Sequence, residues 1–276
     1  MADQRDKILR KAAIKQARRL TAIQKDTDKE IRRLLKKALE QINHDLALAP
    51  DPKSWQAFHL SSLKENVKRA LETMERGASS RLGSAAGQAW QAGIDLVDKP
   101  IEAAGGARFR LDGVLGEIDT RQLRAMRSFM TDRIGDISTS VANRINSELG
   151  LVMIGAKTQH QAAEAIGALI DGGRARATTI IRTELGRAFS VASQERYEQA
   201  AKKLPGLKKQ WHRSGKVHSR PQHDAIDGQV RAVDEPFTLG NGISLMFPRD
   251  PRAPAAETIN CGCESVPFMD TWEQEV

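Results

Sequence analysis

The sequence predicts an α+β fold, in which a long helical N-terminal part precedes a loop-rich C-terminal region with a small antiparallel β-sheet. Three of the ten prolines precede residue 200, and the other seven follow it. Because proline interrupts helices and marks turns, residues 1–200 should be largely helical. Breaks are expected near Pro50 and between Pro100 and Gly106. Residues 205–276 should form loops and short strands.

The spacing of apolar residues supports the helical part. Apolar or small residues recur every three or four positions from Ile8 to Leu46, which predicts one long amphipathic helix. Gly83 and Gly87, four residues apart, are candidates for a close approach of two helices. Similar apolar patterns predict further helices at residues 54–97, 123–149, 162–170 and 174–200.

The basic character of the chain is concentrated near its beginning. The formal net charge is +8, and residues 1–45 hold 13 basic and 7 acidic residues, which accounts for six of the eight charges. Basic side chains without interleaved aromatic residues are suited to non-specific contact with the phosphates of double-stranded DNA. A solvated helix face explains the same pattern equally well. The candidate contact residues are Arg18, Arg19, Arg32, Arg33, Lys36 and Lys37.

We therefore expect two domains. Residues 1–106 should form an extended basic helical arm and a helical region. Residues 107–276 should form a second domain, with helices at 115–200 and a β/loop region at 205–276. Within that region, Asp227-Gly228 and Asn241-Gly242 are strong turn signals that predict the small sheet.

Several classes of protein are excluded by the sequence. No uncharged run reaches the roughly 18–20 apolar residues of a membrane span, so no membrane partner is expected. Met1 leads directly into charged helical sequence, which does not indicate secretion. Cys261 and Cys263 are too close in sequence for an unstrained disulfide that would close a useful loop. They should be reduced thiols or metal ligands in a cytoplasm-like compartment.

The densest polar cluster predicts a metal site. His218, His223, Cys261 and Cys263 could supply two imidazoles and two thiolates to a tetrahedral zinc ion. Four protein ligands would make a closed structural site, whereas loss of His218 would open one position. The alternative is that His223 bonds a backbone carbonyl and the cysteines pack as small hydrophobic residues.

A second cluster, Arg182-Thr183-Glu184, lies in the helix predicted at residues 174–200. By itself it indicates little, because Glu184 and Arg187 are three residues apart and suit an ordinary ion pair on a helix. It becomes informative when it is read together with the polar cluster that contains His223, Cys261 and Cys263. The ordered motif comprises Arg182, Thr183, Glu184, Trp211, Arg220, His223, Asp227, Gly228, Asn260, Cys261 and Cys263.

This order and spacing resemble the phage head morphogenesis family, the minor capsid proteins similar to protein F of phage Mu, over about residues 115–270. The resemblance implies a minor capsid protein of a tailed phage, present in few copies at the portal vertex, that acts in head assembly and DNA packaging or delivery. Its implied partners are the portal protein, other head proteins and double-stranded DNA, the first and last of which the basic residues could contact. The implied location is the virion, in the capsid interior or at the portal vertex, after assembly in the host cytoplasm.

The resemblance also bears on the metal site, but it implies no reaction. In the family pattern, some relatives have cysteines where this chain has Arg220 and His223. This resemblance favours a metal ion bound jointly by this turn and by Cys261 and Cys263. Gly262 stands where arginine is common in the family. The chain therefore offers no arginine-dependent role at that position.

The residues leave a rival function open. His218, His223, Asp224 and Glu257 could form a hydrolytic or nuclease centre assisted by zinc. No nucleophile motif accompanies them, and resemblance in fold does not establish activity. In the favoured interpretation, Arg182 and Glu184 instead connect the helix to the Asp227-Gly228 turn through buried charge-assisted hydrogen bonds.

Overall fold

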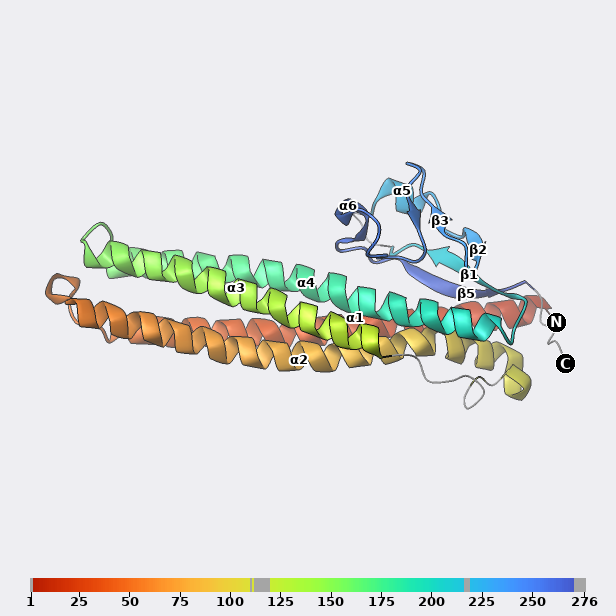
Figure 1. Ribbon diagram of the computed structural model, residues 1–276, viewed down its shortest axis with the longest axis horizontal. Helices are drawn as coiled ribbons and strands as arrows, with labels where there is room; N and C mark the ends of the chain where they lie inside the picture. The colour runs from red at the N-terminus through yellow and green to blue at the C-terminus, as the bar shows by residue number, and fades with distance from the viewer. Residues whose placement is uncertain (1, 110, 112–119, 216–218, 271–276) are drawn as a thin grey trace. The chain divides into compact units, whose positions relative to one another are not determined.

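The computed structural model describes residues 2–109, 111, 120–215 and 219–270. It confirms the α+β prediction, because long helices precede a small antiparallel sheet (Figure 1). Among these residues, no helix has the length and apolar character needed to cross a membrane. The helices are α1 (Ala2–Ala47), η1 (Pro52–Ser54), α2 (Ala57–Gly105), η2 (Gly106–Phe109), α3 (Arg121–Met153), α4 (Gln159–Ala201), α5 (Pro221–Asp224) and α6 (Ala255–Thr258). The strands are β1 (Leu207–His212), β2 (Val230–Ala232), β3 (Phe237–Thr238), β4 (Ser244–Leu245) and β5 (Glu264–Met269).

The chain divides into two compact units. The first, named here the sheet unit, comprises Met1–Gln24, Ala85–Met126 and Arg182–Val276. The second, named the helical unit, comprises Lys25–Ser84 and Arg127–Ile181. Each of the four long helices contributes residues to both units, so neither unit is a continuous stretch of sequence.

The helical unit is built from amphipathic segments of α1, α2, α3 and α4. Leu35, Leu71, Ile145 and Ile170, one from each helix, are at most 1% exposed. Helices with an apolar stripe are stabilised by burying that stripe against one another, and the predicted spacing of three or four residues supplies it.

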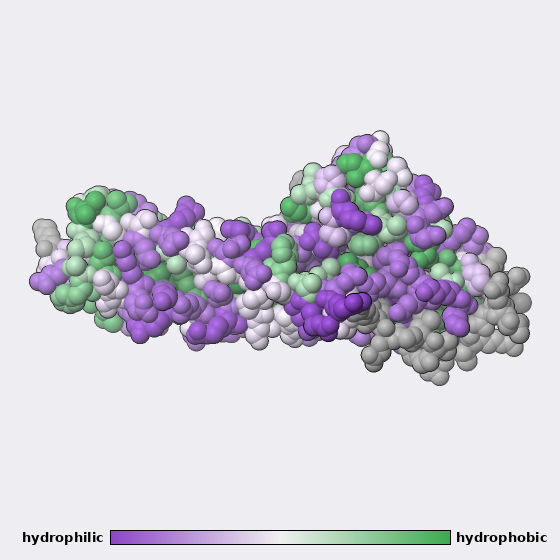
Figure 2. Space-filling model, in the orientation of Figure 1, coloured by the Kyte–Doolittle hydropathy of each residue, from purple (hydrophilic) through white to green (hydrophobic). Residues whose placement is uncertain are grey.

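One end of the helical unit exposes apolar side chains. Leu48, Phe58 and Ile154 are 72%, 62% and 75% exposed, and they lie at or next to the two loops that join the helices. Figure 2 shows hydrophobic residues gathered at this end. Ile154 also lines a cavity of about 670 Å³ together with Trp55. This end of the unit therefore differs from the helix faces, where the large apolar side chains are mostly buried.

The sheet unit has a core shared by helices and strands. Ile101 of α2 and Tyr197 of α4 are fully buried, and they pack in one cluster with Leu207 of β1 and Met269 of β5. The hydroxyl of Tyr197 donates a hydrogen bond of 2.9 Å to the carbonyl of Ser265. This bond satisfies the polar end of a buried aromatic side chain and fixes β5 against α4.

Of two predicted helix interruptions, the one expected between Pro100 and Gly106 is confirmed at the end of that range, and the one between residues 170 and 174 is wrong. Pro100 lies inside α2, which continues to Gly105 and ends before Gly106, at φ +73°. The fully buried side chain of Ile101 next to it packs in the core, and such packing offsets the lost hydrogen bond of proline. The helices predicted at 162–170 and 174–200 are one helix, α4, because Gly173 packs against α3 in the helical unit instead of ending the turn.

The sheet confirms the predicted turns. A three-stranded antiparallel sheet has the order β2-β1-β5, and β3 pairs with β4 in a separate two-stranded ladder. Gly228 and Gly242 have φ values of +83° and +79°, which glycine adopts without strain. The amide of Gly228 donates to the carbonyl of Trp211 at 2.9 Å, so the Asp227-Gly228 turn is bonded directly to the end of β1.

A buried lysine joins the sheet to its surroundings. The ammonium of Lys209 in β1 donates to the carbonyls of Val233 and Met246, each at 2.8 Å, and to the side-chain oxygen of Gln194 at 3.1 Å. Burial lowers the pKa of Lys209 to about 8, while several carboxylates act in the opposite direction. The three oxygen acceptors explain how a charged group is held inside the unit.

The helices of the sheet unit approach closely at one glycine. A Cβ atom on Gly93 of α2 would lie 2.3 Å from the carbonyl oxygen of Phe189 and 3.0 Å from the Cβ of Ala192, both on α4. A Cβ on Gly83 would meet no atom within 4 Å, so the predicted close approach at that residue is wrong. The constraint lies ten residues further along the same helix.

Replacing Gly93 with alanine should therefore destabilise the protein. The added methyl group collides with backbone, which cannot rotate away, and such overpacking typically costs about 1–3 kcal/mol in the free energy of unfolding. Gly83→Ala is the matched control, and it should be neutral or stabilising by up to ~1 kcal/mol, because alanine favours the helix. Urea unfolding followed by circular dichroism measures both changes. Equal stability of the two variants would contradict the packing described for α2 and α4.

Candidate metal centre

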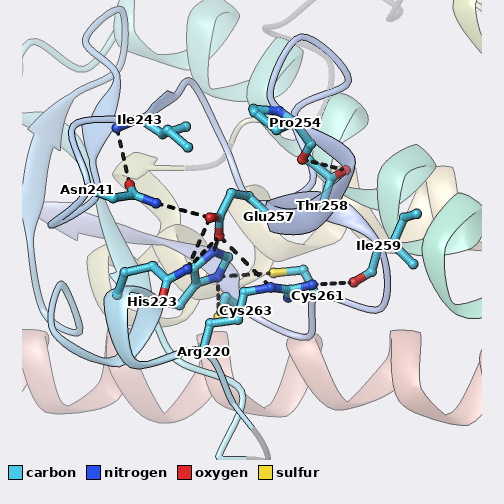
Figure 3. A network of polar contacts seen from close by, with 11 residues as sticks. Arg220, His223, Asn241, Ile243, Pro254, Glu257, Thr258, Ile259, Cys261 and Cys263 are labelled. Atoms are coloured by element: carbon cyan, nitrogen blue, oxygen red, sulfur yellow. Dashed lines mark hydrogen bonds and ion pairs between the residues drawn. The ribbon is translucent and has the colours of Figure 1, made fainter.

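Three predicted ligands meet in the sheet unit. The Nδ1 atom of His223 lies 3.6 Å from the sulfur of Cys261 and 3.7 Å from the sulfur of Cys263 (Figure 3). The ligand atoms all lie within 4.8 Å of one another, and the residues are 1%, 4% and 2% exposed, respectively. One imidazole nitrogen and two sulfurs in this arrangement could hold a metal ion.

Local backbone structure brings these side chains together. Pro221 begins the short helix α5, where its fixed φ is suited to the first turn, and His223 lies on the buried side of that turn. Cys261 and Cys263 follow α6 and precede β5. Asn260 has φ +57°, a left-handed conformation that asparagine tolerates better than most residues. This conformation turns the chain immediately before the two cysteines.

The other nitrogen of His223 contacts a carboxylate. Its Nε2 atom lies 2.9 Å from Oε2 of Glu257, which is 4% exposed. Glu257 also accepts hydrogen bonds from the amides of Gln222, at 3.0 and 3.1 Å, and Asn241, at 3.1 Å, and Arg220 lies 3.9 Å away (Figure 3). These donors lower the pKa of Glu257, although burial alone would raise it. The group facing His223 is therefore an anion.

The pKa values of the two thiols are shifted in opposite directions. A hydrogen bond with Cys263 is the largest influence on the pKa of Cys261 and lowers it, and His223 and Arg249 act in the same direction against burial. The pKa of Cys263 is raised, because its hydrogen bond with Cys261 and its burial favour the neutral thiol. Burial lowers the pKa of His223, but its contacts with Cys261 and Glu257 raise it by more. The surroundings therefore favour the thiolate form of Cys261 over that of Cys263.

Arg249 joins the centre to a helix and a strand. It is 1% exposed and donates to the carbonyl of Cys261 at 3.0 Å, to the hydroxyl of Ser190 in α4 at 2.8 Å and to the carboxylate of Glu264 in β5 at 2.8 Å. A Cβ on Gly186 would lie 2.8 Å from Cδ of Arg249, so this glycine gives the side chain its room. Arg249 was not predicted from the sequence, and the isolated glycine in a helical pattern, Gly186, is the signal that points toward it.

A comparison with protein families finds a match that includes the candidate metal centre. A family model described as phage Mu protein F like protein matches residues 143–266. The match runs from within α3 to within β5 and contains His223, Cys261 and Cys263. Residues 143–266 are therefore similar to phage Mu protein F like proteins. This supports the family to which the order of the motifs pointed.

Two relatives match parts of the chain. The uncharacterized protein YqbB of Bacillus subtilis (strain 168) is 41% identical over 105 residues, which cover 37% of this chain and 32% of that protein. The NAD(+)--arginine ADP-ribosyltransferase EFV of Enterococcus faecalis (strain ATCC 700802 / V583) is 29% identical over 141 residues, which cover 51% of this chain and 28% of that protein. The chain thus spans about a third of the length of these relatives or less. No solved structure matches it.

The remaining family-motif residues lie in varied surroundings. The hydroxyl of Thr183 accepts a hydrogen bond of 3.1 Å from the amide of Asn260, so α4 contacts the turn that precedes the cysteines. Glu184 pairs with Arg187 at 2.7 Å. Arg182 has an exposed side chain, and its backbone carbonyl accepts a bond from Gln24. Thr183 thus connects this cluster to the C-terminal region.

The turn and the tryptophan of the motif adjoin the centre. The ring of Trp211 meets the ring of His223 edge to face, with centroids 5.4 Å apart. Asp227 accepts a hydrogen bond from the amide of Arg213 at 2.9 Å, so the turn is bonded to the chain that follows β1. Arg220 donates to the carbonyl of Ile259 at 2.8 Å, which joins the start of α5 to the segment before the cysteines.

The other predicted ligand and the rival catalytic residue are placed differently. His218 lies outside the described residues, so the described ligand set has three members. Asp224 accepts a hydrogen bond from the hydroxyl of Ser219 and lies 3.9 Å from Arg213. Among the predicted hydrolytic residues that the structure describes, His223 and Glu257 contact each other, as given above.

The basic residues of α1 are exposed, and most have acidic neighbours. In the sheet unit, Arg19 pairs with Asp95, and Arg18 is exposed beside it. In the helical unit, the predicted basic residues lie on the exposed face of α1. Their pairs are Arg32 with Asp28 at 2.7 Å, Arg33 with Glu30 at 2.7 Å and Lys36 with Glu40 at 3.5 Å. Lys37 lines a groove of about 450 Å³ with Arg69 of α2.

Replacing Arg249 with methionine should destabilise the sheet unit. Methionine keeps much of the length but removes the positive charge beside the buried Glu264 carboxylate and the donor to Cys261. Breaking a buried pair in this way typically costs about 3–5 kcal/mol. Arg213→Met is the control, because that side chain is 52% exposed and its carboxylate neighbours, at 3.7 and 3.9 Å, are 39% and 30% exposed, so its ion pairs should be worth less than ~1 kcal/mol. The midpoints of urea unfolding measure both, and similar midpoints would contradict a structural role for Arg249.

Proposed function

We propose that this chain is a minor capsid protein of a tailed phage that acts in head morphogenesis and associates with the portal. The family match over residues 143–266 carries this proposal, since that region includes α4, strands β1 to β4 and the candidate metal centre. Other head proteins are the partners that such a family indicates, and the virion is the location. Its proposed place in the virion is the portal vertex or the capsid interior, which it would reach after assembly in the host cytoplasm.

The exposed basic face of α1 is the proposed contact with the portal or with double-stranded DNA. Residues 1–106, which include this face, remain the proposed arm, and residues 107–276 the proposed head morphogenesis domain. Neighbouring carboxylates reduce the charge that Arg19, Arg32 and Arg33 offer to a partner. Among the described contacts, Arg18 and Lys37 are exposed and have no such ion pair, so they are proposed as the principal contributors.

The centre is proposed to hold a structural zinc ion through His223, Cys261 and Cys263, with His218, which lies outside the described residues, as the proposed fourth ligand. Two sulfurs and an imidazole nitrogen suit zinc better than magnesium or calcium, which prefer oxygen ligands. A catalytic zinc keeps one position open to water or substrate. Here the three described ligands are at most 4% exposed, and this burial favours a structural role over the zinc-assisted hydrolase or nuclease.

Co-purification tests the proposed association. The chain, co-expressed with the portal protein of the same phage genome, should elute with it in one complex during size-exclusion chromatography. Elution as separate proteins would contradict portal association.

A DNA-binding measurement tests the basic face of α1. The affinity of the chain for double-stranded DNA should fall as the salt concentration rises. An Arg18→Gln, Lys37→Gln variant should show weaker binding and a smaller salt dependence, and unchanged DNA binding would exclude these residues as the contact.

Metal analysis tests the zinc proposal. The purified chain should contain about one zinc ion, and a Cys261→Ser, Cys263→Ser variant should lose it. His223→Ala should also lose zinc, whereas the control His160→Ala should retain it, because that side chain is 84% exposed and lies in the helical unit. Chelation should lower the melting temperature of the wild type, since binding energy adds to folding energy. A metal-free wild type purified without chelators would refute the proposal.

A further inference from the structure

Glu257 is the point at which several segments around the centre converge. It lies on α6, and its carboxylate contacts Gln222 and His223 of α5 and Asn241 of the turn between β3 and β4. Its two oxygens take part in four hydrogen bonds among the described residues, at 2.9 to 3.1 Å. Of the residues of the rival hydrolytic centre, Glu257 contacts His223, and its other hydrogen bonds come from amides.

We propose that Glu257 is the positioning residue of the metal centre: it holds the proton of His223 on Nε2 and thereby directs Nδ1 to the ion shared with Cys261 and Cys263. This inference rests on the proposed metal site. It adds a role for a residue that is not itself a ligand. It also commits the site to coordination through Nδ1.

The geometry of the imidazole carries the proposal. A neutral imidazole has one N–H donor and one bare nitrogen, and only the bare nitrogen can bind a metal. Nε2 lies 2.9 Å from a carboxylate oxygen of Glu257, which as an anion can accept a hydrogen bond but cannot donate one. When the imidazole is neutral, as metal binding requires, the tautomer with hydrogen on Nε2 is therefore favoured. The nitrogen left bare in that tautomer is Nδ1, which lies 3.6 and 3.7 Å from the two sulfurs.

The other contacts of Glu257 make it a fixed acceptor. The amides of Gln222 and Asn241 donate to it from two different segments, so the carboxylate cannot turn away without losing these bonds. Asn241 also accepts from the amide of Ile243 within its own turn. Partners of this kind, which orient a ligand without touching the metal, typically change metal affinity by 10–100-fold when they are removed.

The role is tested by measuring zinc affinity in the full-length chain through competition with a chromophoric chelator. Glu257→Ala should weaken binding by about 10–100-fold, and Glu257→Gln, which keeps an oxygen acceptor but can present an amide to Nε2, should fall between it and the wild type. Asp234→Asn is the control, since this exposed carboxylate belongs to the same unit and takes no part in the hydrogen bonds described around the centre. Zinc affinity of Glu257→Ala within twofold of the wild type would overturn the proposal.

A measurement on the wild type keeps the proposal testable if the variants do not fold. The imidazole nitrogens of His223, observed by ¹⁵N nuclear magnetic resonance in the zinc-loaded chain, should show a protonated Nε2 and a metal-bound Nδ1. Coordination through Nε2 would overturn the role of Glu257 while leaving the zinc site intact. A wild-type chain that binds no zinc refutes the zinc site, and the role of Glu257 with it. The outcomes for the site and for its positioning residue are thus distinct.

Discussion

Polar and charged groups held away from water are the constraint on which the sheet unit depends. His223, Cys261 and Cys263 are each less than 5% exposed, and their ligand atoms lie within 4.8 Å of one another. Burying such groups costs free energy unless each finds a partner. The imidazole is met by Glu257, and the carbonyl of Cys261 is met by Arg249. Supplying these partners requires segments that are far apart in the sequence to meet at one place.

Each partner is itself buried and therefore needs further partners. Arg249 is neutralised by Glu264 of β5 and bonded to Ser190 of α4, and its side chain passes next to Gly186. Glu257 takes its remaining hydrogen bonds from amides, which satisfy a carboxylate without adding charge. The network ends on α4 and on β5, whose positions are also fixed by apolar packing. The same residues that could bind a metal thus connect the small helices and loops to the core of the unit.

The sequence predicted those parts of the fold that depend on local properties. Gly228 and Gly242 take left-handed conformations that no neighbour has to enforce, and both turns were predicted correctly. The continuity of the helices was predicted less well. At Pro100 and Gly173, local propensity indicates a break, but the helix continues, because adjacent residues are packed in a core or against another helix. Burial is a property of the folded chain, so spacing alone does not reveal where it exceeds propensity.

The candidate centre shows the same division. Residue type was enough to group His223, Cys261 and Cys263, because few other side chains bind zinc, but it gave no reason for Thr183 to share their motif. The structure supplies one: the hydroxyl of Thr183 accepts the amide of Asn260, which is 77 residues away. That amide belongs to the left-handed residue from which the chain turns toward the cysteines. Thr183 on α4 thus acts on the centre by holding this turn, a relation that requires no contact with a ligand and that only the folded chain makes visible.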